Sequence, residues 1–427
     1  MEMKRVLVFP GGTEIGLEIN KSLRYIKDIE LFSVGSDVSN PAPFFYKNHF
    51  IIPSIYEKEW INALNAIIER YNINYIFPAY DDIITALARN KERIKANIIS
   101  SPLKTCLITR SKKKTYKIFE NKLPVPKVFA INSKIDLFPV FLKPEKGQGS
   151  KDTYLIKSME ELKGLIKRVK DPMILEYLSG KEYTVDCFTD RDKGLLFCEG
   201  RERVRIRNGI SVNSIIVSNE KFKEFAKIIS SLLEFYGAWF FQLKEDSNGV
   251  LKLMEIAPRI AGTMAINRVR GINFPLLSIY ENERIDIEIL INSYNIEIDR
   301  ALQNKYKLSL SYNTVYLDFD DVLILKGKIN PLIIKFLYQC QNTNKSIILL
   351  TKHRKNIKET LKKFNICKTL FSKIINLKDF DSKVDYVIEK ESIFIDDSFQ
   401  ERKQVSDKCN IPTFDLSMIE GLLNDNF

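Results

Sequence analysis

Two apolar segments interrupted by polar side chains carry the clearest potential for chemistry. Gln242 and Glu255 lie on either side of Asn248-Gly249, a dipeptide typical of a tight hairpin turn. On paired strands these two side chains can point the same way and bring their oxygens together, which suits Mg²⁺ completed by water and nucleotide phosphates. Arg259, shortly beyond, is placed to hold a developing negative charge. The alternative is an ordinary hairpin whose polar residues face solvent.

A second group of residues has the character of a phosphate site. Lys143 follows an apolar segment that predicts a strand at 138–142. The glycine-rich run after it includes Gly147, Gly149 and Ser150. Backbone N–H groups of such a loop can cover phosphates while the lysine meets their charge, although no Walker A pattern is present. Lys112 and Lys114 lie upstream in a basic run that, taken alone, is typical of a solvated face.

An alternating segment places three arginines on one face of a predicted strand: Arg201, Arg203 and Arg205. Such a face either pairs with acidic neighbours or binds an anion, and the pattern favours neither.

The elements that must position these residues begin with an alternation of strands and helices. Apolar runs predict strands at 5–9, 30–34, 50–53 and 75–78. Amphipathic patterns predict one helix that follows the glycine turn and ends near residue 27, and two more at 60–71 and 82–96. This is the pattern of a parallel α/β domain that ends near residue 105. The run GGTEIG imitates a dinucleotide-binding turn, but it is not GxGxxG, so helix–strand packing is its favoured role.

Composition limits the classes of function. A chain of 427 residues should hold two or three domains. Its net charge of +12 suits an anionic partner, but the lysines are scattered among acids, which favours a solvated surface over nucleic-acid binding. Six cysteines without metal-ligand spacing indicate a reducing compartment, and no run is long enough to span a membrane, so we expect a cytoplasmic protein. Two histidines leave proton transfer to carboxylates, lysines or water.

A polar linker at 304–311 separates a second set of carboxylates from the first part of the chain. Asp318 and Asp320 follow an apolar strand predicted at 314–317. Two carboxylates at this spacing can act as a nucleophile and a general acid with Mg²⁺ between them. The alternative is a strand end capped by aspartates.

Three further positions complete this second pattern. The predicted strand at 346–350 ends in Thr351, and the one at 392–395 ends in Asp396-Asp397. Lys383 precedes the last strand, with other lysines nearby as alternatives.

The ordered motifs of the first part resemble the signature of the ATP-grasp superfamily, over about residues 1–290. They are Lys112 or Lys114, Lys143 with its glycine loop, Glu176-Tyr177-Leu178, Glu182, Gln242, Glu255 and Arg259. Each motif is weak alone, and the order of seven is specific. Ala257 stands where the family usually has a metal-binding asparagine. The same ending is known in purine-pathway carboxyaminoimidazole ribonucleotide synthetases, so a sparser metal shell is expected rather than a dead site.

This resemblance implies a role for each motif. The lysines and the loop would contact nucleotide phosphates, residues 176–178 would hold adenine, and Glu182 would bind the ribose. Gln242 and Glu255 would carry Mg²⁺. Arg259 would stabilise an acyl-phosphate and a tetrahedral intermediate.

The second part is similar to haloacid dehalogenase-like phosphohydrolases over about residues 313–427. This similarity implies that Asp318 is the nucleophile and Asp320 the general acid, while Thr351 and Lys383 hold the phosphoryl group. Asp318, Asp320, Asp396 and Asp397 would form the Mg²⁺ site. The short interval from Asp318 to Thr351 leaves no room for a large cap.

The two resemblances together imply a bifunctional enzyme with an α/β and α+β multidomain fold. The expected parts are a Rossmann-like pre-ATP-grasp domain at 1–108, an ATP-grasp domain at 109–300 and a Rossmannoid haloacid dehalogenase-like domain at 313–427. The first two would use ATP and Mg²⁺ to join a small-molecule carboxylate and an amine, and Arg201, Arg203 and Arg205 would contact substrate. The third would hydrolyse a related phosphorylated small molecule. Alternatives are a ligase with a non-hydrolytic regulatory domain and a basic nucleotide- or nucleic-acid-binding protein; homo-oligomerisation stays open.

Overall fold

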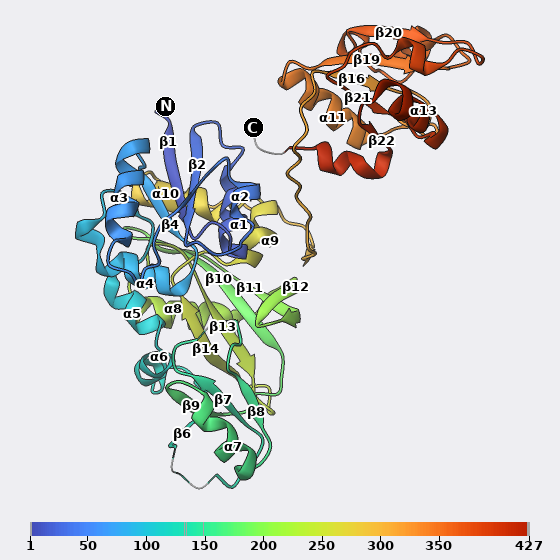
Figure 1. Cartoon of the computed structure of the whole chain (residues 1–427). Helices are drawn as coiled ribbons and strands as arrows, with labels where there is room; N and C mark the ends of the chain where they lie inside the picture. Colours follow the sequence, from blue (N-terminus) through green and yellow to red (C-terminus); the bar gives the residue numbers. More distant parts are fainter. Residues whose placement is uncertain (1, 132, 134, 148, 425–427) are drawn as a thin grey trace. The chain divides into compact units, whose positions relative to one another are not determined.

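The computed structural model describes residues 2–131, 133, 135–147 and 149–424, and the chain divides into two compact units, residues 1–302 and 303–427 (Figure 1). Within the described residues, no helix is both long and apolar enough to cross a bilayer.

The first unit opens with a parallel sheet of order β3-β2-β1-β4-β5. Its strands are β1 (Lys4–Phe9), β2 (Ile29–Gly35), β3 (Asn48–Ile51), β4 (Tyr75–Pro78) and β5 (Asn97–Ile98). The helices of this region are α1 (Glu14–Leu23), α2 (Ala42–Phe45), α3 (Trp60–Tyr71) and α4 (Asp81–Arg89). The alternation read from the sequence is therefore present, with α1 and α4 shorter than expected.

The turn between β1 and α1 shows what the glycines do there. A Cβ at Gly16 would lie 2.5 Å from the Gly11 carbonyl oxygen, so glycine permits the close approach of helix and turn. Thr13 caps the helix by accepting a hydrogen bond from the Gly16 N–H at 3.0 Å. Close packing accounts for these glycines without a dinucleotide.

Two further sheets complete the first unit. A four-stranded sheet of order β6-β9-β7-β8 contains β6 (Val128–Phe129), β7 (Val140–Pro144), β8 (Tyr154–Ile156) and β9 (Pro172–Glu176), with α7 (Met159–Leu165). A six-stranded sheet of order β14-β13-β10-β11-β12-β15 contains β10 (Glu182–Asp190), β11 (Gly194–Arg207), β12 (Ile210–Val217), β13 (Gly237–Glu245), β14 (Leu251–Ala257) and β15 (Glu297–Asp299). Helices α5 (Leu103–Thr109), α6 (Lys112–Phe119), α8 (Glu220–Leu232), α9 (Ala265–Val269) and α10 (Phe274–Asn282) connect these parts.

The second unit has its own five-stranded parallel sheet, of order β20-β19-β16-β21-β22. Its strands are β16 (Thr314–Leu317), β19 (Ser346–Thr351), β20 (Lys373–Asn376), β21 (Ser392–Ile395) and β22 (Thr413–Phe414). A small hairpin of β17 (Ile324–Leu325) and β18 (Lys328–Ile329) precedes α11 (Pro331–Asn342), and α12 (Ile357–Lys363) and α13 (Phe399–Cys409) follow. Among the described residues between β16 and α11, this hairpin is the only helix or strand element.

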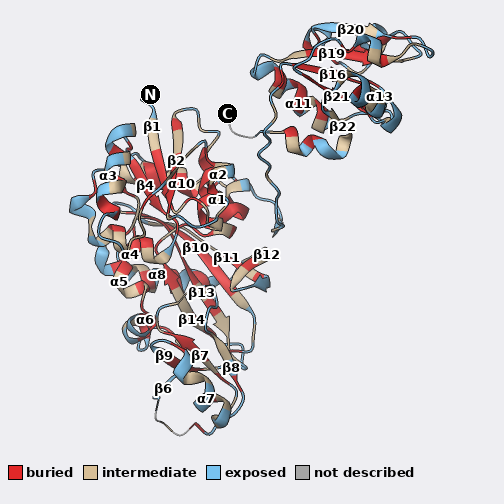
Figure 2. Ribbon diagram, in the orientation of Figure 1, coloured by how far each residue is buried: buried red, intermediate tan, exposed pale blue. Residues whose placement is uncertain are grey.

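Each unit buries its own apolar core, and in Figure 2 the strands of the sheets are largely in the buried colour. One core lies around β16, β19 and β21, with Phe319 and Phe336 fully buried. In the first unit, Trp239 and Phe241 of β13 are fully buried against α8. The apolar face of β13 is thereby fixed in the core, which leaves alternate residues such as Gln242 on the opposite face.

Candidate functional site

A cavity of about 550 Å³ lies over the six-stranded sheet of the first unit. It is lined by most of the residues singled out in the first part of the sequence: Lys112, Lys143, Gly147, Gly149, Ser150, Glu182, Arg201, Arg203, Gln242, Glu255 and Arg259. These residues are spread over 148 positions of the chain, so the fold brings them together from several elements.

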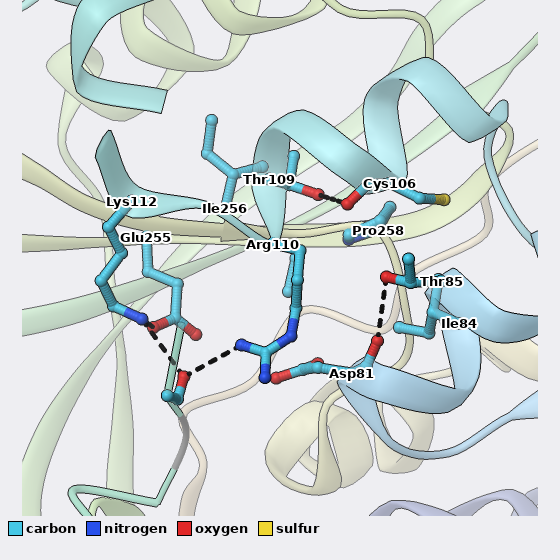
Figure 3. A pocket seen from close by; sticks show the side chains of 12 residues that line it. Asp81, Ile84, Thr85, Cys106, Thr109, Arg110, Lys112, Glu255, Ile256 and Pro258 are labelled. Atoms are coloured by element: carbon cyan, nitrogen blue, oxygen red, sulfur yellow. Dashed lines mark hydrogen bonds and ion pairs between the residues drawn. The ribbon is translucent and has the colours of Figure 1, made fainter. Parts of the chain in front are cut away.

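Gln242 and Glu255 are directly paired across β13 and β14. The Nζ atom of Lys112, the first residue of α6, lies 3.5 Å from a Glu255 carboxylate oxygen, and Figure 3 shows these two side chains facing each other. The Gln242 side-chain oxygen accepts a hydrogen bond from Arg203 at 3.2 Å. An amide oxygen and a carboxylate on one face suit a Mg²⁺ ion that takes its remaining ligands from phosphates and water.

Lys143, on β7, is buried with 5% of its surface exposed. Burial, with a contribution from the positive charge of Lys112, lowers the pKa of its ammonium group to about 7. Its Nζ atom lies 3.3 Å from the Tyr116 hydroxyl and has no carboxylate ion pair among the described residues. A bound polyanion would supply the missing counter-charge.

The glycine loop after β7 is attached at both sides of the cavity. The Gly147 carbonyl accepts hydrogen bonds from Lys112 at 3.2 Å and from Arg110 at 3.4 Å, and both contacts are drawn in Figure 3. On the other side, a Cβ at Gly209 would lie 2.5 Å from the Ser150 hydroxyl, so the loop sits on the turn between β11 and β12. Gln148 lies outside the described residues.

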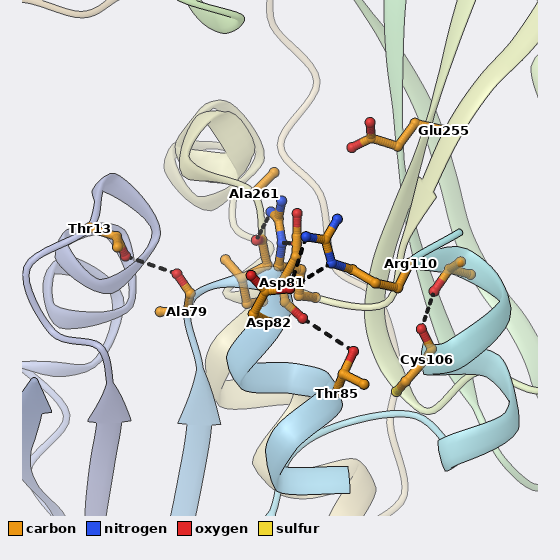
Figure 4. Close-up of polar contacts among 12 residues, drawn as sticks. Thr13, Ala79, Asp81, Asp82, Thr85, Cys106, Arg110, Glu255 and Ala261 are labelled. Atoms are coloured by element: carbon orange, nitrogen blue, oxygen red, sulfur yellow. Dashed lines mark hydrogen bonds and ion pairs between the residues drawn. The ribbon is translucent and has the colours of Figure 1, made fainter. Parts of the chain in front are cut away.

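Arg259 forms an ion pair with Asp81, which follows strand β4 of the parallel sheet. Its Nε atom pairs with Asp81 at the start of α4, and its guanidinium lies 5.1 Å above the Phe240 ring. Burial opposes ionisation of Asp81, but the charge and hydrogen bond of Arg259, together with the charges of Arg110 and Lys112, hold the pKa of that carboxyl below its usual value. The neighbouring Asp82 pairs with Arg110 at 2.8 Å (Figure 4). The two aspartates after β4 therefore serve as anchors for arginines, with neither side chain capping the helix.

The predicted arginine face is divided by an irregularity in β11. Arg201 forms a buried two-point ion pair with Asp186, at 2.9 and 3.1 Å, and Arg203 pairs with Glu182. The pairing register of β11 shifts between residues 202 and 205, and Arg205 binds Asp299 at a half-exposed position. Arg205 does not line the cavity, so the expectation of one shared face was wrong for this residue.

Two other predictions do not match the cavity. Lys114 is exposed on α6 and does not line the cavity, which leaves Lys112 as the one of the two that does. None of Glu176, Tyr177 and Leu178 is in the cavity wall. Glu176 instead receives the Lys127 backbone N–H at 2.7 Å and the Lys252 ammonium at 2.5 Å, while Leu178 is buried.

Several residues of the site were missed at the level of sequence. Asp186 and Asn267 hold Arg201 in place, and Arg300 lines the cavity from the end of β15. Asp186 is an acid inside an apolar strand, which is a visible signal of a buried partner. The pairing of β15 with β12 has no comparable signal, because β15 is three residues long and follows a polar stretch.

The second unit gathers carboxylates at the carboxyl ends of β16 and β21. Asp318, Asp396 and Asp397 offer carboxylate oxygens that all lie within 4.8 Å of one another. Lys383 binds Asp396 at 2.6 Å and Asp318 at 2.9 Å, and the Thr351 hydroxyl, fully buried at the end of β19, has no hydrogen-bond partner among the described residues. Burial raises the pKa of Asp318 to about 6 against the opposing charge of Lys383. Three carboxylate oxygens at this separation fit a hard divalent cation.

Asp320 lies apart from this cluster at an exposed position. Both of its carboxylate oxygens face Nδ1 of His353, at 2.9 and 3.1 Å, while Nε2 of the same ring is 3.0 Å from the Thr360 hydroxyl. The ring also packs edge-on against Phe319, with 5.0 Å between centroids. His353 was not singled out by the sequence motifs.

Parts of the first unit are similar in sequence to known protein families. The family model described as ATP-grasp in the biosynthetic pathway with Ter operon matches residues 168–305, and a PylC-like N-terminal domain model matches residues 13–100. A D-alanine–D-alanine ligase from Fusobacterium nucleatum is 28% identical over 139 residues, which are 30% of this chain and 48% of that protein. The chain thus matches about half the length of this relative.

Two solved structures share the fold at low identity. N5-carboxyaminoimidazole synthetase from Staphylococcus aureus, complexed with ADP, has a TM-score of 0.57 and 17% identity, covering 67% of this chain and 79% of that one. The biotin carboxylase domain of Hydrogenobacter thermophilus 2-oxoglutarate carboxylase, in complex with MgADP and bicarbonate, has a TM-score of 0.55 and 15% identity, covering 68% and 71%. Residues 168–305 are thus similar in sequence to an ATP-grasp family, and the fold of the chain is similar to that of both solved structures.

Proposed function

We propose that the first unit is an ATP-dependent carboxylate–amine ligase. The observation that carries this proposal is a single cavity that combines Lys112, Lys143, the Gln242–Glu255 pair and Arg259. In the proposed reaction, a carboxylate oxygen of the acid attacks the terminal phosphorus of ATP, and ADP leaves. The amine nitrogen then attacks the carbonyl carbon of the acyl-phosphate, phosphate leaves, and the nitrogen loses a proton to give the amide.

The chain's own residues have distinct tasks in this scheme. Lys143 and Lys112 hold the phosphates, and the loop at 147–151 covers them with backbone N–H groups. Arg259, fixed by Asp81, faces the negative charge that develops on the carbonyl oxygen. Mg²⁺ held by Gln242 and Glu255 would neutralise phosphate charge when bound. Fixed donors of this kind lower the barrier without reorganising during the reaction.

An assay of ADP release tests the ligase proposal. The full chain with MgATP should release ADP only when an acid and an amine are both supplied from a screen of amino acids and sugar acids. Glu255→Gln should reduce this release strongly, since it removes the only carboxylate of the proposed metal pair. ATP turnover that does not depend on any acid, or no ATP binding at all, would contradict the proposal.

For the second unit we propose a Mg²⁺-dependent phosphatase. The specific observation is the cluster of Asp318, Asp396 and Asp397 joined by Lys383. A carboxylate oxygen of Asp318 would attack phosphorus while the alcohol oxygen leaves with a proton from Asp320, and water would then hydrolyse the aspartyl-phosphate. Lys383 and Thr351 would hold the phosphoryl oxygens, and the bound metal would neutralise their charge.

A conservative substitution of Asp318 tests the phosphatase proposal. Asp318→Asn should abolish Mg²⁺-dependent hydrolysis of phosphate monoesters such as 4-nitrophenyl phosphate, while Asp407→Asn, which removes an exposed carboxylate on α13, should leave it unchanged. Hydrolysis that survives in Asp318→Asn would remove this residue from the nucleophile's role.

Because both units are in one chain, we further propose that they act on the same intermediate. If each unit processed a phosphorylated substrate and its unphosphorylated counterpart equally well, this would argue against the coupling.

A further inference from the structure

The wall of the cavity contains a positive charge for which the described residues supply no ion pair. Arg300 follows β15 and is fixed there because its backbone N–H donates to the Val212 carbonyl at 2.7 Å. Its guanidinium makes no ion pair or hydrogen bond with any residue that the structure describes, although it lines the cavity. Burial lowers the pKa of this guanidinium, so the protein pays a desolvation cost for holding a cation here.

Glycine at position 262 makes space for the Arg300 head group. A Cβ added at Gly262 would lie 3.1 Å from one guanidinium nitrogen of Arg300 and 3.2 Å from Cγ of Glu14. Arg300 therefore lies against the loop that follows Arg259, beside the start of α1. Glu14 is close enough to interact with Arg300 electrostatically, but it forms no ion pair with it among the described contacts.

A second arginine in the same wall is also incompletely satisfied. Arg201 is 1% exposed and is locked by Asp186, which in turn accepts a hydrogen bond from Asn267 at 3.2 Å. This leaves Nη1 of Arg201 buried without a hydrogen-bond partner among the described residues. Buried donors without partners are uncommon in folded proteins, and a ligand is one of the few groups that can satisfy them.

The surroundings of the Arg300 guanidinium associate it with Arg259. Lys143 and Lys112 come from β7 and α6, whereas the Arg300 guanidinium lies against Gly262, three residues after Arg259, and beside Glu14. Arg259 faces the reacting carbonyl in the proposed ligase. A negative group near Arg300 would therefore belong to a molecule that reaches the reacting centre, rather than to ATP.

We infer that Arg300, supported by Arg201, forms a specificity subsite for a negatively charged group on one of the two substrates that are joined. This inference rests on the proposed ligase function. The shared chemistry is a carboxylate or phosphate remote from the bond that forms, and two sources supply it. One is the acid substrate, as a dicarboxylic acid; the other is the amine substrate, as an amino acid whose own carboxylate is not activated. A guanidinium binds either through paired charge-assisted hydrogen bonds.

Calorimetric titration of the full chain, saturated with MgADP, tests the subsite with matched ligands. Succinate and succinamate differ only in one charged end and form the acid arm; alanine and ethylamine differ by a carboxylate and form the amine arm. In one arm the ligand with the extra carboxylate should bind about ten- to a hundred-fold more tightly, because a hydrogen bond to a charged group is lost without it. The arm that shows the preference identifies the source.

The variants decide whether Arg300 is responsible. In Arg300→Gln the preference should disappear, and Arg300→Lys should keep part of it because the charge remains while the fork is lost. Arg205→Gln is the matched control, since it neutralises an arginine of the same sheet that lies outside the cavity, and it should retain the full preference. Affinity for MgADP should be the same in all of them, which also shows that they fold.

Two results would overturn the subsite. One is equal binding of both members in each arm by the wild-type chain, including the absence of any binding at millimolar concentration. The other is a preference that persists in Arg300→Gln. Failure of MgADP to bind the wild-type chain would instead refute the ligase proposal, so the two failures are distinguishable.

Discussion

The buried Lys143 of the proposed phosphate site leads to a quantitative prediction about protons. The pKa of Lys143 is lowered to about 7 by burial and by the charge of Lys112, from an ordinary value near 10.5. At pH 8 a group with this pKa is about 90% neutral. ATP phosphates favour the ammonium form, so binding should drive uptake of about 0.9 proton at pH 8 and about 0.1 at pH 6.

The same shift has a consequence for stability, and its direction is fixed. Because the folded-state pKa lies below the unfolded value, the unfolded chain binds more protons between pH 7 and pH 10.5, and stability rises with pH over this window. The charged lysine costs the folded state about 5 kcal/mol below pH 7, as an upper figure from a shift of this size. Lys143→Met should therefore be more stable than the wild-type chain at pH 6, and this advantage should shrink as pH rises toward 10.

The proton uptake can be measured by calorimetry of MgATP binding, without acid or amine, in buffers of different ionisation enthalpy. The slope of heat against ionisation enthalpy gives the number of protons. Lys114→Met, which alters an exposed lysine of α6 outside the cavity, should leave the slope unchanged. A slope at pH 8 that equals the slope at pH 6 would refute the assignment of a neutral Lys143 to the free protein.

Three further predictions concern single carboxylates and one glycine. Asp81→Asn should lower kcat about ten- to a hundred-fold with little change in the KM for ATP, because Arg259 loses its ion-pair partner while the proposed phosphate site is unchanged. An unchanged kcat in steady-state assays would count against the role of Asp81 in positioning Arg259. Asp186→Ala should destabilise the chain by about 3–5 kcal/mol in urea unfolding, since it leaves Arg201 buried and unpaired. Asp299→Ala, which breaks an exposed pair, should cost less than about 1 kcal/mol. Equal losses of stability would mean that burial does not decide the strength of these ion pairs. Gly209→Ala should raise the KM for ATP by about five-fold or more, because its φ of +73° and the 2.5 Å approach to Ser150 oppose a Cβ under the glycine loop. An unaltered KM would show that ATP binding does not depend on the contact between Gly209 and this loop.

The positions of Gln242, Glu255 and Lys143 were predictable because their signals are local. The Asn248-Gly249 turn fixes which residues of the hairpin oppose each other, and Gln242 is paired with Glu255 as expected. Lys143 likewise comes directly from a strand into a glycine loop. Spacing along one chain segment was enough for both.

Other parts of the site depend on contacts that spacing does not encode. The register shift in β11 separates Arg205 from Arg201 and Arg203, and an irregularity of one or two residues leaves no clear mark in the sequence. The strand β12 escaped prediction because its apolar residues are interrupted by Ser211, Asn213 and Ser214. Without β12 there was no place for β15, and hence no reason to bring Arg300 to the cavity.

The most direct test of the central claim follows one oxygen atom. An acid that supports ADP release is labelled with ¹⁸O in its carboxylate and incubated with the full chain, MgATP and the amine, and the phosphate released is analysed by mass spectrometry. An acyl-phosphate intermediate predicts one ¹⁸O atom in each phosphate, because the carboxylate oxygen that attacks phosphorus leaves with it. Phosphate without label, formed together with ADP and amide, would contradict activation of the carboxylate in this cavity.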